Sequence, residues 1–308
     1  MENAYFPEGT LLTHPENMEY TSCIEGLEYA KQNGIILEAR VVLCDAQHNL
    51  YVELGDYRGI IPRQETLYNP SGEEIKDIAI ITRVGKSVCF MVTDIVRDAG
   101  GARIYLSRRK AQIECCRNYI SRLDPGDVVE AAVTHLEKFG AFCDIACGLV
   151  GLLPIDCISV SRISHPRERF FCGQTIKCVV KNTDREVCRI TLTHKELLGT
   201  WEENASMFRA GETAAGIIRS VEPYGIFVEL APNLAGLAEW CDGVCEGQTA
   251  AVYIKSIIPE KMKIKLVIID TSPENMNING EEYFFEGGHM DEWRYSPDGC
   301  AKEIYTEF

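Results

Sequence analysis

Apolar and polar residues alternate with a period of two in several short segments of the chain. The clearest group of segments begins at Gly126 with GDVVEAAVTHLEKFGAFCDI, and a second begins at Gly211 with GETAAGIIRSVEPYGIFVEL. Each starts with glycine and reaches an aromatic-Gly-x-Phe sequence thirteen residues later. This alternation predicts half-buried β-strands, and the internal glycine suits a bend between two of them.

Three more strands are predicted at matching places in both groups. A short third strand follows the turn at GLLP or GLAE, the glycine of GQTIKCVV or GQTAAVYI opens a fourth, and the last is RITLTHK or KIKLVII. The glycines that open the third and fourth strands are Gly151, Gly173, Gly236 and Gly247. Each group therefore predicts five short strands.

A weaker copy of the pattern lies upstream. It runs from Gly34 through GIIP at Gly59 to RIYLSRRK at Arg103, and its first aromatic position contains His48. Helical periodicity predicts short connectors over residues 111–123 and 194–208, and one amphipathic helix over residues 18–33. The sequence thus predicts an all-β chain with short helical connectors and an N-terminal helix.

Five short strands with these glycines suit a small Greek-key barrel of the OB type. The sequence resembles the S1 domain of ribosomal protein S1, which also occurs in polynucleotide phosphorylase. The resemblance lies in FGAF, GLLP and RITLTHK of the second copy, YGIF, GLA and KIKL of the third, and LSRRK of the first. It implies three tandem five-stranded OB-fold barrels.

The repeats divide the chain into seven segments. We expect an N-terminal helical segment, a divergent S1-like domain, a helical linker, an S1 domain, a second linker, a second S1 domain and an acidic, aromatic-containing tail. Their ranges are 1–33, 34–110, 111–123, 124–196, 197–208, 209–270 and 271–308.

The resemblance assigns the aromatic pairs to RNA binding. They are Phe139 and Phe142 in the second copy and Tyr224 and Phe227 in the third, with Tyr51 at the second position of the first copy. Exposed rings would stack on bases without strong sequence preference. The alternative is that the rings fill the core, because alternation across a glycine does not fix which face a ring occupies.

The family surface also uses an aspartate before the last strand and an arginine that opens it. Asp184 and Arg189 match in the second copy, and Asp98 and Arg103 match in the first. Arginine suits phosphate because its planar group offers several donors. The aspartate would either fix the turn or accept a hydrogen bond from a ribose hydroxyl.

The third copy departs from this pattern, with Pro259 and Lys263 at the two positions. A histidine common on the family surface is absent from all copies, where Pro62, Pro154 and Glu239 stand instead. The second copy is therefore the best predicted RNA site.

Two sets of arginines have open interpretations. Arg108 and Arg109 of the first copy, with Lys110, would help that barrel to dock on either RNA or protein. Arg162, Arg167 and Arg169 lie in the long connection before the fourth strand of the second copy. They form either part of the ligand rim of an OB fold or a solvated basic loop.

The net charge of −15 argues against tight nonspecific binding to duplexes. The distribution of this charge along the chain, however, leaves room for RNA binding. Residues 1–33 contain 1 basic and 6 acidic groups and residues 271–308 contain 2 basic and 9 acidic groups, so the rest of the chain is close to neutral. A basic face on individual barrels is therefore possible.

The remaining features favour a cytoplasmic binding protein over an enzyme. The acidic N-terminus and the lack of a long apolar run predict neither secretion nor a membrane span. The 14 cysteines show no paired CxxC pattern, so we expect reduced, mostly buried thiols, no metal and no cofactor. Nucleotide-binding and hydrolase motifs are absent from the sequence.

The segment after Asp270 is acidic but rich in aromatic residues, and we expect part of it to fold back against a barrel. The sequence as a whole predicts a protein that binds single-stranded RNA, with mRNA as the ligand and the small ribosomal subunit as a possible partner. The alternative is an OB-fold scaffold in RNA processing or ribosome assembly that binds other proteins and has little RNA affinity.

Overall fold

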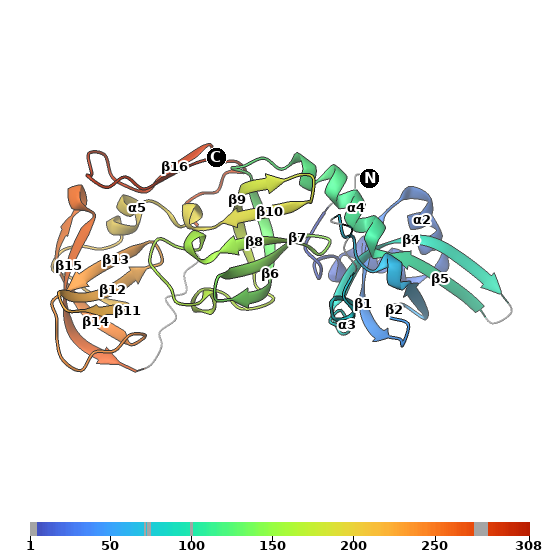
Figure 1. Cartoon of the computed structure of the whole chain (residues 1–308), viewed down its shortest axis with the longest axis horizontal. Helices are drawn as coiled ribbons and strands as arrows, with labels where there is room; N and C mark the ends of the chain where they lie inside the picture. Colours follow the sequence, from blue (N-terminus) through green and yellow to red (C-terminus); the bar gives the residue numbers. More distant parts are fainter. Residues whose placement is uncertain (1–4, 71, 73–74, 99–100, 274–282) are drawn as a thin grey trace.

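A computed structural model describes residues 5–70, 72, 75–98, 101–273 and 283–308, with the side chain of Asp98 outside the description. Three closed five-stranded barrels follow one another along the molecule, from the first at the right of Figure 1 to the third at the left. The predicted fold class of three tandem OB-type barrels is therefore confirmed.

The first barrel has the strand order β1-β2-β3-β5-β4, in which β3 and β5 are parallel and close the barrel. The β4–β5 hairpin extends beyond the barrel (Figure 1). The elements are β1 (Ile36–Cys44), β2 (Leu50–Leu54), β3 (Tyr57–Ile61), the short helices η2 (Arg63–Glu65) and α3 (Asp77–Ile81), β4 (Ser87–Asp98) and β5 (Gly101–Ser107).

The second barrel has the same topology, with β8 and β10 as its parallel pair. Its elements are β6 (Val128–Glu137), β7 (Gly140–Ala146), β8 (Leu149–Pro154), the single turns η4 (Ile155–Cys157) and η5 (Pro166–Glu168), β9 (Thr175–Asp184) and β10 (Arg189–Thr193). Along β6, Val129, Ala131 and Val133 point into the core while Glu130 faces solvent. The alternation in the sequence thus corresponds to inward and outward positions of the strand.

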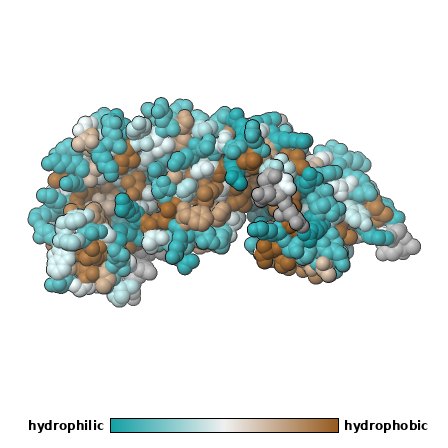
Figure 2. Space-filling model, in the orientation of Figure 1, coloured by the Kyte–Doolittle hydropathy of each residue, from teal (hydrophilic) through white to brown (hydrophobic). Residues whose placement is uncertain are grey.

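The third barrel repeats the plan once more, with β13 and β15 parallel. Its elements are β11 (Thr213–Glu222), β12 (Gly225–Ala231), β13 (Leu234–Ala238), β14 (Thr249–Ile258), η7 (Pro259–Lys261) and β15 (Lys263–Ser272). Figure 2 shows apolar side chains in separate patches over the barrels, with hydrophilic side chains between them.

The N-terminal helix predicted over residues 18–33 is two helices. They are α1 (Pro15–Ser22) and α2 (Ile24–Asn33), which follow the single turn η1 (Leu11–Thr13). Cys23 between them has extended backbone angles, and its sulfur accepts a hydrogen bond from the amide of Gly26. A local cap that periodicity does not reveal therefore ends one helix and starts the next.

The connector between the first two barrels contains α4 (Arg108–Asn118) and η3 (Ile120–Arg122), and Arg108 is fully buried. Its Nε donates to the Glu8 carboxylate at 2.7 Å, and the Glu8 amide donates to the Asp144 side chain of β7 at 2.7 Å. The interpretation of Arg108 as an exposed docking cation is therefore wrong. Together with Glu8, Arg108 joins the N-terminal segment to both barrels.

The second and third barrels are joined in the same manner. Arg169 lies in the connection between β8 and β9, and its Nη2 donates at 2.7 Å to Glu229 of β12. Arg219 of β11 donates to the same carboxylate oxygen at 2.7 Å. Arg169 is therefore part of an inter-barrel contact, which corrects its assignment to either a ligand rim or a solvated loop.

The connector to the third barrel contains η6 (Lys195–Leu198) and α5 (Trp201–Ser206), and the C-terminal segment packs against it. The amide of Phe284 donates to the carbonyl of Leu197 at 2.9 Å. The segment ends in a small sheet of β16 (Glu292–Arg294) and β17 (Tyr305–Glu307). Residues 283–308 therefore fold back on the barrels, as expected for part of this segment.

Within the described part of the chain, no helix is long and apolar enough to cross a membrane.

Candidate nucleic-acid interface

Two aromatic rings stand at the β6–β7 hairpin of the second barrel. Phe139 is 56% exposed and Phe142, on β7, is half-buried. Their ring centroids lie 5.9 Å apart with the rings perpendicular. Gly140 between them lies against the carbonyl of Leu153, which leaves no room for a Cβ atom. The pair is therefore at the surface and not in the core.

A third ring extends this surface. His135 of β6 is paired with Phe142 in the strand register and stacks on it, with centroids 6.3 Å apart and an interplanar angle of 28°. Its Nε2 lies 2.8 Å from a carboxylate oxygen of Glu137. The sequence prediction missed His135, because continued alternation after Val133 would place it in the core, and only the irregularity in register between Val133 and His135 turns its ring outward.

The third barrel repeats the arrangement at the β11–β12 hairpin. Tyr224 is 69% exposed, Phe227 is half-buried, and their centroids lie 6.2 Å apart at 86°. A Cβ on Gly225 would meet the carbonyl oxygen of Ala238 at 2.7 Å, so this position also requires glycine. Trp240, just after β13, is exposed as well.

Strand registers place a cation on the same face as the rings of the second barrel. Phe142 pairs with Leu152 of β8, and Leu152 pairs with Thr191 of β10. Arg189 precedes Thr191 by two residues and is exposed, so it shares the outward side of β10. Ordinary strand spacings put the Cα atoms of Phe142 and Arg189 about 12 Å apart.

Asp184 fixes the turn from which Arg189 emerges. Its Oδ1 accepts hydrogen bonds from the amides of Glu186 at 3.2 Å and Val187 at 3.4 Å. Asp184 and Arg189 are also paired across the β9–β10 hairpin. Of the two roles open to this aspartate, the structure provides direct contacts for the structural one.

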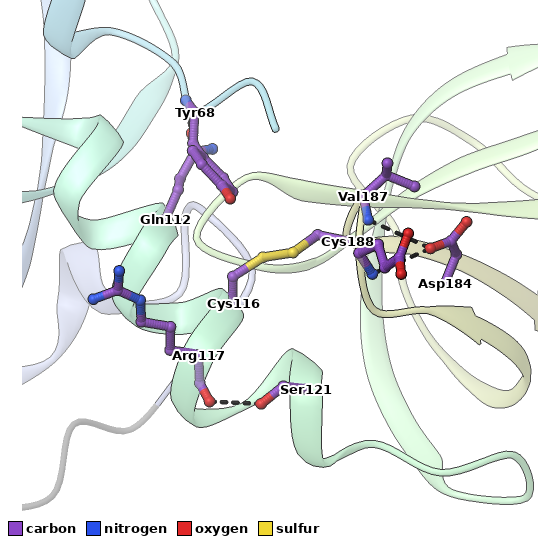
Figure 3. Close-up of a disulfide and its surroundings, with 9 residues drawn as sticks. Tyr68, Gln112, Cys116, Arg117, Ser121, Asp184, Val187 and Cys188 are labelled. Atoms are coloured by element: carbon purple, nitrogen blue, oxygen red, sulfur yellow. Dashed lines mark hydrogen bonds between the residues drawn. A yellow bond between two sulfur atoms is a disulfide. The ribbon is translucent and has the colours of Figure 1, made fainter. Parts of the chain in front are cut away.

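A disulfide joins the same turn to the connector helix (Figure 3). Cys188, which immediately precedes Arg189, is bonded to Cys116 of α4. The expectation that the thiols are reduced is therefore wrong for this pair. The turn that presents Arg189 is anchored from two sides, by the Asp184 side chain and by the covalent bond to α4.

The third barrel presents lysines in place of the arginine. Lys263 opens β15 and is exposed, and the Pro259 position lies in the preceding single turn η7. Glu239, the acid at the position of the missing histidine, forms a salt bridge with Lys255 at 3.3 Å. Part of the negative charge near this face is thus neutralised within the barrel.

The first barrel differs most from the predicted site. Tyr51 is half-buried and its hydroxyl donates to Asp45 at 3.2 Å. His48 has a positive φ of 62°, and its Nδ1 lies 2.9 Å from Nη1 of Arg63. Arg103 is exposed on β5, whereas the side chain of Asp98 lies outside the described residues.

The connection between β8 and β9 borders a cleft of about 740 Å³ beside the third barrel. Arg162 and Arg167 line it together with Arg219, and the acids Glu168 and Glu246 line it too. Arg219 is already bonded to Glu168 and Glu229. The cleft therefore has mixed charge and is less suited to phosphate than the ring-bearing faces.

In the part of the chain that the structure describes, no group of three or more His, Cys, Asp or Glu side chains is placed to hold a metal ion. The side chains described above offer stacking, hydrogen bonding and charge attraction at the barrel faces.

A known family model matches the second barrel. Residues 122–195 match the model of the S1 RNA binding domain. The match contains the rings Phe139 and Phe142 and the turn with Asp184 and Arg189.

Similarity to individual proteins extends beyond that barrel. The chain is 28% identical over 219 residues to small ribosomal subunit protein bS1 of Chlamydia muridarum, covering 70% of the chain and 38% of that protein. It is 30% identical over 263 residues to a bS1 homolog of Bacillus cereus, and this match covers 81% of the chain and 64% of that protein. For bS1 of Staphylococcus aureus the identity is 28% over 281 residues, and the match covers 86% of the chain and 69% of that protein. The chain thus spans well under half the length of the first of these relatives.

Proposed function

We propose that this chain, an S1-like protein with three tandem OB-type barrels, binds single-stranded RNA along the outer faces of its barrels. The observation that supports this most directly is the exposed ring pair beside a cation on one face of the second barrel. Phe139, Phe142 and Arg189 supply stacking surfaces and a phosphate contact on the same side of the sheet. Each stacked base contributes about 1–3 kcal/mol, independent of base identity.

The ligand that suits this surface is an unpaired strand. Bases must be free of a duplex to lie against Phe139 or Tyr224. The formal net charge of −15 adds to this preference, because long-range repulsion must be overcome by local stacking.

The biological role that we propose is retention of mRNA in translation, in the cytoplasm and in contact with the small ribosomal subunit. The relatives that cover most of the chain are proteins of the small ribosomal subunit by name. The role requires no catalysis, and the side chains of the ring-bearing faces serve binding alone. On this account the protein is not an enzyme.

Several weak faces on one chain would act together on a long strand. A strand bound at the second barrel stays close to the third, because Arg169 and Glu229 hold the two barrels in contact. The second binding event is then intramolecular and gains from a high effective concentration. The affinity should therefore rise with the length of the RNA.

The test is a comparison of a short and a long single-stranded RNA with wild type and the F139A/F142A double variant. We expect the variant to lose far more affinity for the long RNA than for the short one, since the short RNA can bind at the third barrel alone. Tyr305→Ala, at an exposed aromatic residue in the C-terminal sheet, is the control and should leave both affinities unchanged.

Two results would contradict the proposal. Equal losses on the two RNAs would exclude joint action of the barrels. No RNA binding by wild type at low salt would exclude RNA as the ligand and favour the protein scaffold.

A further inference from the structure

Strand pairing gives each barrel one residue at the centre of its outer face. In the third barrel, Phe227 pairs with Leu237, and Leu237 pairs with Lys265 of β15. In the first, Tyr51 pairs with Ile60, and Ile60 pairs with Tyr105 of β5. The corresponding residue of the second barrel is Thr191 of β10. The three barrels therefore have an identical frame but different chemistry at one position.

The three central residues face outward. Lys265 is exposed and its neighbours Ile264 and Leu266 are in the core. Tyr105 and Thr191 are each half-buried between two core residues of their strands. The central position is thus on the ring-bearing side of every barrel. It lies two strands away from the second aromatic position, so the Cα atoms of the two residues are about 10 Å apart.

We propose that the central residue sets how each barrel holds RNA, with Tyr105 as a second stacking ring in the first barrel and Lys265 as a phosphate contact in the third. This inference rests on the proposed RNA binding. It adds a second stacking ring to the first barrel and assigns the steepest salt dependence to the third, whereas neutral Thr191 adds neither.

The charges around Lys265 support a phosphate contact. Lys263 lies two residues earlier on the same side of β15, and neither lysine forms a salt bridge within the described residues. Lys255 of the neighbouring strand is different, because Glu239 already neutralises it. The residue opposite Lys265 on β14 is the neutral Ser256. A phosphate at this point meets two lysines in succession.

The surroundings of Tyr105 support stacking. Tyr51 and Tyr105 lie on either side of Ile60, so a tyrosine, an isoleucine and a tyrosine form a continuous row. The Tyr51 hydroxyl is held by Asp45, which fixes one end of the row. The opposite neighbour of Tyr105 is Asp94, whose charge is paired with Lys31 at 2.8 Å. This row supplies a second ring in the barrel where His48 replaces the first aromatic residue.

The experiment measures binding of single-stranded oligo(U) and oligo(A) to full-length variants over a series of salt concentrations. We expect Lys265→Gln to reduce the slope of log K against log salt by about 0.7, the value for one lost phosphate contact on a single strand. We expect Tyr105→Ala to weaken binding at least about fivefold without changing the slope, and Tyr105→Phe to retain wild-type affinity. Lys302→Gln, at an exposed lysine of the C-terminal segment, is the matched control and should have the affinity and the slope of wild type.

The two proposals fail in different ways. Suppose that F139A/F142A loses RNA binding as expected. An unchanged salt slope in Lys265→Gln, or an unchanged affinity in Tyr105→Ala, would then overturn the assignment of central residues and leave the RNA-binding proposal intact. Equal weakening by Tyr105→Ala and Tyr105→Phe would also overturn it, because stacking does not need the hydroxyl. Absence of RNA binding by wild type would remove both proposals.

Discussion

Arg169, in the connection between two strands of the second barrel, donates a 2.7 Å hydrogen bond to Glu229, which is completely buried on the third barrel. Glu229 stands two residues after Phe227 on the same strand. Asp144 stands two residues after Phe142 and accepts a hydrogen bond from the amide of Glu8, whose carboxylate accepts one from the amide of Cys89 in the first barrel. In both cases one strand carries a ring of the binding face and the acid that joins its barrel to the preceding one, so the faces are held in a defined mutual position.

Removal of the Glu229 carboxylate should destabilise the junction between the second and third barrels. Glu229→Ala leaves Arg169 and Arg219 buried without their shared partner, and breaking a buried ion pair from one side costs about 3–5 kcal/mol. The free energy of unfolding of the third barrel, from denaturant titration, measures this loss. Glu239→Ala removes an exposed salt bridge and should cost at most about 1 kcal/mol. Similar small losses in both variants would contradict the structural role of Glu229.

Buried His194 should make stability depend on pH. Burial lowers the pKa of His194 to about 4, and its Nδ1 donates to the carbonyl of Lys177 at 2.7 Å. The unfolded chain has a histidine pKa near 6.5 and takes up the proton first, so this stability is present above about pH 6.5 and is lost as the pH falls towards 4. The expected loss is about 3 kcal/mol.

Denaturant unfolding between pH 7 and pH 4 tests this expectation. The profile of His194→Gln should be flatter than that of wild type over this range. His14→Gln alters an exposed histidine and should keep the wild-type profile. A His194→Gln profile parallel to wild type would show that another group controls the acid response.

The disulfide between Cys116 and Cys188 should stabilise the second barrel. It closes a loop with a sequence separation of 72 residues, for which the chain-entropy estimate is about 4 kcal/mol. Unfolding of wild type should therefore occur at lower denaturant concentration after treatment with dithiothreitol. The C116S/C188S double variant should already have the lower stability and should not respond to the reductant. A wild-type transition that is unaffected by the reductant would exclude this contribution.

The sequence was sufficient for the three barrels because five alternating strands and two glycine turn positions recur within it. Pairs of rings around Gly140 and Gly225 were also predictable, since their spacing is local. The interruption between α1 and α2 at Cys23 was not predictable, because one residue with extended backbone interrupts an otherwise helical pattern.

Contacts between distant segments account for most of what the sequence could not predict. Arg108 and Arg169 looked like surface cations, and only the packing of neighbouring barrels shows that they meet buried acids. The disulfide depends on the approach of α4 to the β9–β10 turn. Lys265 and Tyr105 emerge as central residues only once the parallel pairing that closes each barrel is known.

The most direct measurement of the central claim is a titration of the intact protein with single-stranded poly(U) at several salt concentrations, beside a duplex RNA of equal length. The account predicts saturable binding of the single strand at low salt, a linear fall of log K with log salt, and much weaker binding of the duplex. Failure of the single strand to bind at low salt, or equal binding of strand and duplex, would contradict it.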